Sequence, residues 1–122
     1  MLDWEDLSAL SVVISSPARY IRFFLAFISR SVRQPLYEWI VRKAREFGLA
    51  GATVFRGLEG FGAHSRVHTA KILRLSSDLP VVVEIVDTPE KIEQFMPLID
   101  DAIKEGLATI EKATIRFYRG GK

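Results

Sequence analysis

The chain of 122 residues contains no cysteine. Disulfide scaffolds, thiolate zinc sites and cysteine nucleophiles are therefore excluded, and the composition fits a reducing compartment. No run of about twenty apolar residues occurs, so the sequence predicts no transmembrane helix. Acidic residues stand at Asp3, Glu5 and Asp6, where a secretory signal peptide carries basic ones. These absences together predict a cytoplasmic protein.

Known catalytic and phosphate-binding motifs are also missing. The sequence has no Walker-type loop, no dinucleotide fingerprint, no Ser/His/Asp ordering and no paired-carboxylate motif. We therefore expect no enzyme, and no cofactor other than a nucleotide or anion effector.

The histidines are His64 and His68, spaced i, i+4. On a helix this spacing places two imidazoles on one metal, and Glu59 is the nearby candidate for a third ligand. Arg66 lies between the histidines and would repel a cation. Exposed or hydrogen-bonded loop histidines are the simpler interpretation, and a metal-handling module that uses His64 and His68 is an alternative.

Hydrophobic residues make up 48% of the chain and charged residues 26%, which is the composition of one ordinary globular domain. The net charge of +2 is unevenly distributed. Residues 19–74 hold eleven Lys or Arg and three acids, whereas residues 75–122 hold six Lys or Arg and nine acids. A basic half can attract phosphates, nucleic acid or an anionic membrane. Arg42, Lys43 and Arg45 also fit the solvated face of a helix, which is the simpler interpretation.

The pattern of apolar residues predicts an α+β fold. We expect strands at residues 20–27, 52–56, 71–75, 81–86 and 107–118, and helices at residues 35–47 and 89–105. Pro35 is expected at the first position of the first helix, and Thr88 is expected to cap the second. Gly48 and Gly106 should end the helices, and Pro97 should kink the second one.

This order of elements is that of the ferredoxin-like βαββαβ sandwich, an antiparallel sheet with two helices on one face. We assign residues 20–119 to this ferredoxin-like domain, residues 1–19 to an N-terminal extension and residues 120–122 to a tail. The apolar spacing in the extension fits a short amphipathic helix that Ser15, Ser16 and Pro17 would stop, and a mobile tail is the alternative. Strands 20–27 and 81–86 are apolar along their length, so we expect copies of the chain to cover the second sheet face in an oligomer.

The stretch from Gly51 to Thr69 leads from an apolar strand into a glycine-rich polar loop. Because glycine visits positive φ without steric cost, its glycines are expected to free the backbone. The N–H groups and cations of such a loop suit a phosphate or another anion, and a hairpin whose glycines serve turn geometry is the alternative. The predicted ligand-binding residues are Arg56, Gly57, Glu59, Gly60, Gly62, Ser65, Arg66, His68 and Lys71.

Several segments carry a family resemblance. They are Pro35-Leu-Tyr-Glu38, Gly48-Leu-Ala-Gly-Ala-Thr-Val54, Arg56-Gly-Leu-Glu-Gly-Phe-Gly62, Ser65-Arg-Val-His68 and Leu75-Ser-Ser-Asp-Leu-Pro-Val-Val-Val-Glu-Ile-Val-Asp87. In them the chain resembles the family called domain of unknown function 190, which is grouped with PII-like signalling proteins. The resemblance implies a ferredoxin-like fold, a trimer whose sheets line the inside, and a regulatory function. Members are often encoded beside fluoride exporters, so it also implies a membrane transporter of that kind as partner. The Gly-Asp-Gly-Lys-type phosphate loop of PII proteins has no counterpart at Lys104-Glu-Gly-Leu-Ala108.

Nucleic-acid binding is a further alternative, because ferredoxin-like folds include RNA-binding modules that stack bases on sheet aromatics. The candidate aromatics are Phe23, Phe24, Phe55 and Phe117. The aromatic and glycine-rich RNA-binding signature is missing from the predicted strands, and oligomerisation would bury the sheet.

Overall fold

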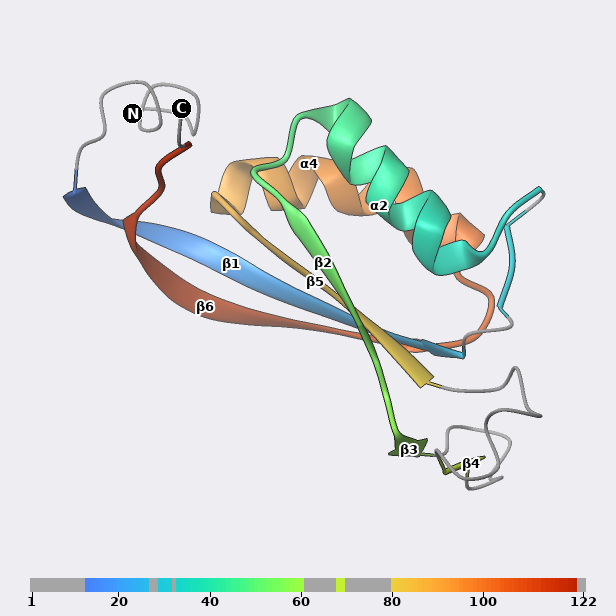
Figure 1. Cartoon of the computed structure of the whole chain (residues 1–122). Helices are drawn as coiled ribbons and strands as arrows, with labels where there is room; N and C mark the ends of the chain where they lie inside the picture. The colour runs from blue at the N-terminus through green and yellow to red at the C-terminus, as the bar shows by residue number, and fades with distance from the viewer. Residues whose placement is uncertain (1–12, 27–28, 32, 61–67, 70–79, 121–122) are drawn as a thin grey trace.

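The computed structural model describes residues 13–26, 29–31, 33–60, 68–69 and 80–120. Its elements are β1 (Val13–Ala26), α2 (Leu36–Phe47), β2 (Ala52–Arg56), β3 (Glu59–Gly60), β4 (His68–Thr69), β5 (Pro80–Asp87), α4 (Pro89–Ile99), the 3-10 turn η1 (Asp100–Ala102) and β6 (Leu107–Phe117). An antiparallel four-stranded sheet has the order β2-β5-β1-β6, and both helices cover one of its faces (Figure 1). The predicted ferredoxin-like α+β sandwich is confirmed. The strand expected at residues 71–75 lies outside the described residues.

The core lies between the sheet and the two helices. Along β5 every second residue is buried, beginning with Val81, because successive strand residues point to opposite faces. The rings of Phe47 and Phe95 join the helices, with their centroids 5.8 Å apart. The buried apolar residues of this core that lie on the strands and helices are Ile21, Phe23, Leu25, Val81, Val83, Ile85, Leu36, Ile40, Ala44, Ile92, Phe95 and Ile99.

The predicted end of α2 and the predicted start of α4 are confirmed. Gly48 adopts the left-handed conformation with φ of 90°, and its N–H bonds to the Arg45 carbonyl at 3.1 Å. The Thr88 hydroxyl accepts a 3.3 Å hydrogen bond from the Lys91 N–H, which satisfies one of the free donors at the start of α4.

Two other helix boundaries differ from the prediction. Pro35 has ψ of 141° and is the N-cap of α2 rather than its first helical residue. Helix α4 ends at Ile99, well before Gly106, and continues only as the turn η1. Pro97 lies two residues before that end and cannot donate a backbone hydrogen bond, which favours early termination. Among the described residues no helix is long and apolar enough to cross a membrane.

The first strand starts earlier than predicted. It begins at Val13, although we expected an extension up to residue 19 and a strand from residue 20. From Arg19 to Phe24 β1 pairs with both β5 and β6, whereas residues 13–18 pair with β6 alone. Proline is tolerated at strand edges, so Pro17 fits a strand at a point where we expected it to stop a helix. Residues 13–18 of β1 and 113–117 of β6 are called the overhang below.

Candidate ligand-binding site

The predicted ligand-binding stretch is described in part. Arg56, Gly57, Glu59 and Gly60 are described in full, and His68 in its backbone. Strands β3 and β4 pair with Gly60 opposite His68, so these residues form a small hairpin beyond the end of β2 (Figure 1). The predicted residues that lie outside the described part of the chain are Gly62, Ser65, Arg66, Lys71 and His64.

Gly57 and Gly60 both lie close to the ring of Pro80. The Gly57 N–H donates to the Pro80 carbonyl at 2.7 Å. A Cβ atom on Gly57 would lie 2.7 Å from the Pro80 Cγ atom, and one on Gly60 would lie 3.1 Å from it. Positive φ occurs at Gly48 and Gly106 and not at these two positions. The expectation of positive φ is therefore wrong at Gly57 and Gly60, where the close approach of a proline ring leaves no room for a Cβ at Gly57 and little room at Gly60.

The metal alternative stays a prediction. In the described ranges no group of three or more His, Cys, Asp or Glu side chains is placed to hold a metal ion. His64 and the side chain of His68 lie outside those ranges.

No other described helix or strand covers the central part of the sheet face away from the helices, which is called the open face below. The strand register sets Phe24 beside Val82 and Leu107, and Val82 beside Phe55, so the four side chains share this face. Phe24, Phe55 and Leu107 are 38%, 51% and 59% exposed. A cluster of exposed large apolar side chains on a small domain marks a contact surface or a binding site.

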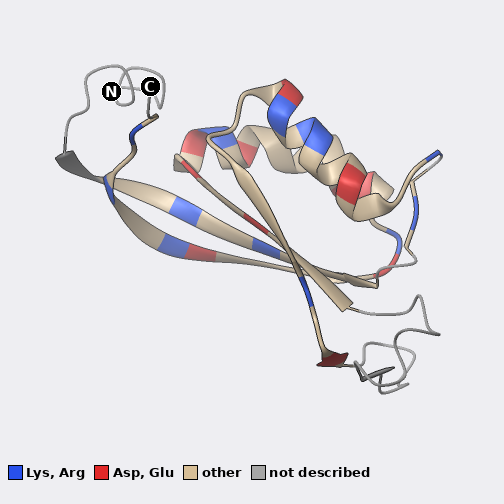
Figure 2. Cartoon of the chain, viewed as in Figure 1, with Lys and Arg blue, Asp and Glu red and all other residues tan. Residues whose placement is uncertain are grey.

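A polar cluster formed by β1, β5 and β6 lies on the open face, and Figure 2 colours the charged positions along these strands. Arg22 Nε lies 3.1 Å from Glu84 Oε2, Arg22 Nη1 lies 3.9 Å from Glu111 Oε2, and the guanidinium lies 4.6 Å from the centroid of the Tyr20 ring. Hydrogen bonding to Glu84 is the main cause that raises the pKa of the Tyr20 hydroxyl, and burial adds to it. Two carboxylates around one guanidinium leave the cluster with a net negative charge.

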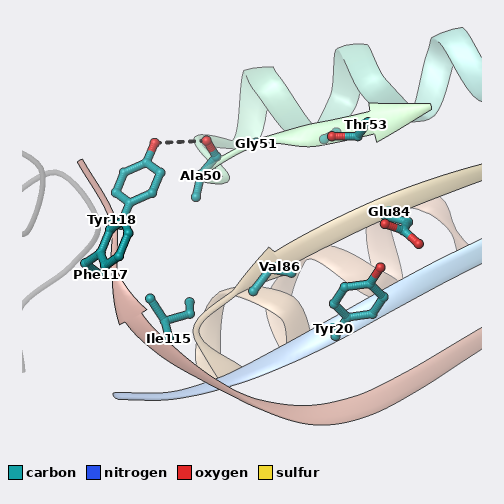
Figure 3. Close-up of a pocket in the computed structure, with 10 residues that line it drawn as sticks. Tyr20, Ala50, Gly51, Thr53, Glu84, Val86, Ile115, Phe117 and Tyr118 are labelled. Carbon is teal, nitrogen blue, oxygen red and sulfur yellow. Dashed lines mark hydrogen bonds between the residues drawn. The ribbon is translucent and has the colours of Figure 1, made fainter. Parts of the chain in front are cut away.

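A cavity of about 420 Å³ opens on the same face (Figure 3). Ligand pockets are typically about 300–1,000 Å³, so the volume suits a small molecule. Its walls come from the middle of β1 and β5, the start of β2 and the end of β6. The lining residues are Tyr20, Ala50, Gly51, Ala52, Thr53, Glu84, Val86, Ile115, Phe117 and Tyr118.

The cavity joins two strands that lie at opposite edges of the sheet. Strands β2 and β6 are separated by β5 and β1 in the sheet order, yet both contribute to the lining. Beyond the end of β6 the Tyr118 hydroxyl donates a 3.0 Å hydrogen bond to the Ala50 carbonyl, in the turn before β2 (Figure 3). This contact brings the end of the overhang to the start of β2.

Asp87 holds the same turn from the inside. Its side chain is fully buried, and Oδ2 accepts a 2.8 Å hydrogen bond from the Ala50 N–H while Oδ1 accepts one of 2.7 Å from the Thr88 N–H. Burial raises the pKa of the Asp87 carboxyl, and the two backbone donors oppose that effect. On the outside of the turn Lys91 Nζ donates to the Gly48 carbonyl at 3.2 Å. The turn is thus fixed by groups from β5 and α4.

The chemistry of the cavity favours a flat group that donates hydrogen bonds. Glu84 is the charged side chain in its described lining, which disfavours a phosphate there. The rings of Tyr20, Phe117 and Tyr118 offer faces and edges for an aromatic group. The Thr53 hydroxyl can donate or accept.

The arrangement of the sheet and helices is that of PII-like proteins. CPII, a nitrogen regulatory PII-like protein from Thiomonas intermedia K12 solved with ADP and bicarbonate, has a TM-score of 0.63 at 13% identity over 86% of this chain and 94% of CPII. A putative PII-like signaling protein from Thermus thermophilus has a TM-score of 0.60 at 12% identity over 84% of this chain and 92% of that one. GlnK of B. subtilis with ATP has a TM-score of 0.53 at 11% identity over 80% and 82% of the two chains. These likenesses concern the fold alone.

The family follows from the sequence comparisons. The family model of DUF190, described as an uncharacterized ACR, matches residues 18–115. A UPF0166 protein of Aquifex aeolicus is 37% identical over 97 residues, which are 80% of this chain and 91% of the relative. A UPF0166 protein of Methanocaldococcus jannaschii is 32% identical over 104 residues, which are 84% and 94% of the two chains. The chain belongs to the DUF190 family, as its motifs predicted.

Sequence reasoning assigned no cavity residue to the predicted ligand site, although it named Phe117 as a candidate aromatic for nucleic-acid binding. Tyr20 and Glu84 carried a usable signal, because they are polar members of otherwise apolar strand segments. Tyr118 carried none, because its contact with Ala50 joins positions 68 residues apart.

Proposed function

We propose that this protein is a non-enzymatic, PII-like regulatory module of the cytoplasm that binds a nucleotide or another small anionic ligand. Ligand binding changes how well residues 56–71 fit a partner protein. The ring group of the ligand lies in the cavity beside Tyr20 and Glu84, and its anionic part lies toward residues 56–71, at a cleft between subunits.

The cavity is the observation that carries this proposal. It combines aromatic rings at Tyr20, Phe117 and Tyr118 with a carboxylate acceptor at Glu84, the two features that a nucleobase with amino groups needs. CPII and GlnK, which share the fold, were solved with ADP and with ATP. The likeness of fold supports the ligand class, and the cavity supports its position on this chain.

The anionic part of the ligand is assigned to the predicted cationic stretch. Arg56 is exposed at the end of β2, and its strand also supplies Thr53 to the cavity. Guanidinium groups bind phosphates through paired hydrogen bonds. The other residues that we include are Gly57, Glu59, Gly60, Gly62, Ser65, Arg66, His68 and Lys71.

The proposed assembly is a trimer whose open sheet faces meet. Phe24, Phe55 and Leu107 support it, because burying apolar surface stabilises association by roughly 25 cal/mol per Å² before the costs of association are subtracted. The fluoride exporter that the family resemblance implies as partner stays a prediction, since no described contact bears on it.

Nucleic-acid binding is less well supported. The cluster of Arg22, Glu84 and Glu111 gives the centre of the open face a net negative charge, which repels a phosphate backbone. On α2 the Lys43 Nζ atom lies 3.5 Å from Glu46 Oε1 and 5.7 Å from the centroid of the Trp39 ring. These contacts within one helix are those of a solvated helix face.

Titration calorimetry of the purified protein against ATP, ADP, AMP and bicarbonate tests the proposal. We expect a nucleotide to bind with a Kd on the order of micromolar. Arg56→Ala should weaken it by roughly tenfold through the lost charge-assisted hydrogen bonds. Arg45→Ala, a matched change on α2, should leave the Kd unchanged. If the well-folded protein binds none of these compounds, the proposed binding of a nucleotide or small anion is wrong.

A further inference from the structure

The overhang is a two-stranded part of the sheet, in which Ala18 is fully buried. Over residues 13–18 strand β1 pairs with β6 alone, because β5 ends opposite Arg19. A shift in register between Val13 and Ser16 further interrupts the pairing. A two-stranded ribbon is marginally stable by itself in water. Contacts outside the ladder must therefore help to fix the position of this ribbon.

The Tyr118 hydroxyl supplies such a contact at a rigid point. It donates to the Ala50 carbonyl at 3.0 Å, and the N–H of the same residue is held by the buried Asp87 at 2.8 Å. The acceptor thus belongs to a turn that the core already fixes. This hydrogen bond, called the tether below, connects the two-stranded overhang to a turn that the core fixes.

The tethered segment is also a wall of the cavity. Ile115, Phe117 and Tyr118 line it from the side of β6, and Ala50 and Gly51 line it from the side of β2 (Figure 3). The separation of these two walls sets the width available to a flat ligand.

From this geometry we infer that Tyr118 is a positioning residue, whose hydroxyl holds the end of β6 against the turn before β2 and so fixes the width of the cavity. The assignment of a nucleotide to this cavity rests on the proposed function. The tether itself is a property of the ligand-free chain. The hydroxyl keeps the β6 wall in place beside a bound ligand, so its loss is expected to speed dissociation.

Tyr118→Phe tests the tether, because it keeps the ring and removes only the donor. Amide hydrogen exchange of the ligand-free protein should accelerate at residues 115–117 by about 2- to 12-fold, the range that a net hydrogen-bond contribution allows. ADP dissociation from the variant should accelerate by a similar factor. Tyr37→Phe, the same chemical change on α2, should alter neither rate.

The outcomes separate the tether from the proposed function. Faster exchange at residues 115–117 with faster ADP release supports both. Faster exchange in a protein whose wild type binds none of ATP, ADP, AMP and bicarbonate supports the tether and contradicts the proposed function. Unchanged exchange in Tyr118→Phe overturns the tether whatever ADP does. Faster exchange with unchanged ADP release overturns the positioning role.

Discussion

The Asp87 carboxylate accepts a 2.8 Å hydrogen bond from the Ala50 amide, 37 residues earlier in the chain. It joins the end of β5 to the turn that leads from α2 into β2. The same turn supplies one wall of the cavity and accepts the hydrogen bond from Tyr118. The position of the candidate site therefore depends on a residue that does not line it.

Asp87→Ala should destabilise the fold by about 2–4 kcal/mol, because the buried Thr88 N–H and the half-buried Ala50 N–H lose their acceptor. Denaturant unfolding measures this change. Glu93→Ala, at an exposed acid on α4, should stay within about 0.5 kcal/mol of wild type. Equal effects of the two substitutions would contradict the role assigned to Asp87.

The stability of the protein should also depend on the titration of Asp87. Burial raises its folded pKa above the ordinary value of 3.8, so the folded state binds the proton more tightly than the unfolded state. This contribution is fully present below 3.8 and is lost as pH rises through the folded pKa. The unfolding free energy of wild type minus that of Asp87→Asn should therefore fall as pH rises from 3.8 through the folded pKa of Asp87. A difference that is constant or grows with pH would contradict the predicted direction of the pH dependence.

Gly57→Ala should destabilise the protein by about 1–3 kcal/mol, because its Cβ would meet the Pro80 ring at 2.7 Å. Thermal unfolding of Gly57→Ala, Pro80→Ala and the double variant measures the coupling. The double variant should recover part of the loss. Gly51→Ala is the matched control, since no atom lies within 4 Å of its Cβ and its φ is not positive. An equal loss in that control would show that the proline contact does not matter.

Gly106→Ala should destabilise more than Gly48→Ala. Both glycines have positive φ, at 148° and 90°. Only at Gly106 would a Cβ also clash, 2.8 Å from Leu25 Cδ2 and 2.9 Å from the Phe24 carbonyl. We expect a loss of about 1–2 kcal/mol at Gly48 from strain alone and a further 1–3 kcal/mol or so at Gly106. Chemical denaturation of both variants provides the comparison, and the reverse order would be inconsistent with this turn.

Leu107→Glu should dissociate the proposed trimer. Leu107 lies on the open sheet face and is 59% exposed, and Leu98 on α4 is 55% exposed. A charge on the open face would be buried without a partner in the assembly, at a cost of several kcal/mol. Light scattering should show a smaller mass for Leu107→Glu and an unchanged mass for Leu98→Glu. Equal masses for both variants and wild type would rule out the open face as the interface.

The sequence predicted most of the fold because its signals are local. The apolar run of residues 81–86, the Thr88 cap and the left-handed Gly48 depend on neighbours within one element. The start of β1 at Val13 was missed because Pro17 favours a turn in sequence, and only the sheet order shows that it lies where β1 is an edge. The end of α4 was misplaced because the apolar stripe continues beyond Ile99 in the sequence. The helix ends at Ile99, two residues after Pro97.

The candidate site was less predictable. Sequence reasoning chose the glycine-rich stretch, where Gly57 and Gly60 prove to accommodate Pro80. The cavity depends on β2 and β6 approaching across the sheet, and on the pairing of Tyr118 with Ala50. No local pattern encodes that approach.

Amide hydrogen exchange of the wild-type protein with and without saturating ADP tests the central claim most directly. The account predicts that ADP slows exchange at residues 50–53 and 115–118, which line the cavity, and at residues 56–60. Protection confined to the helical layer, or no change at any of these residues, would contradict it.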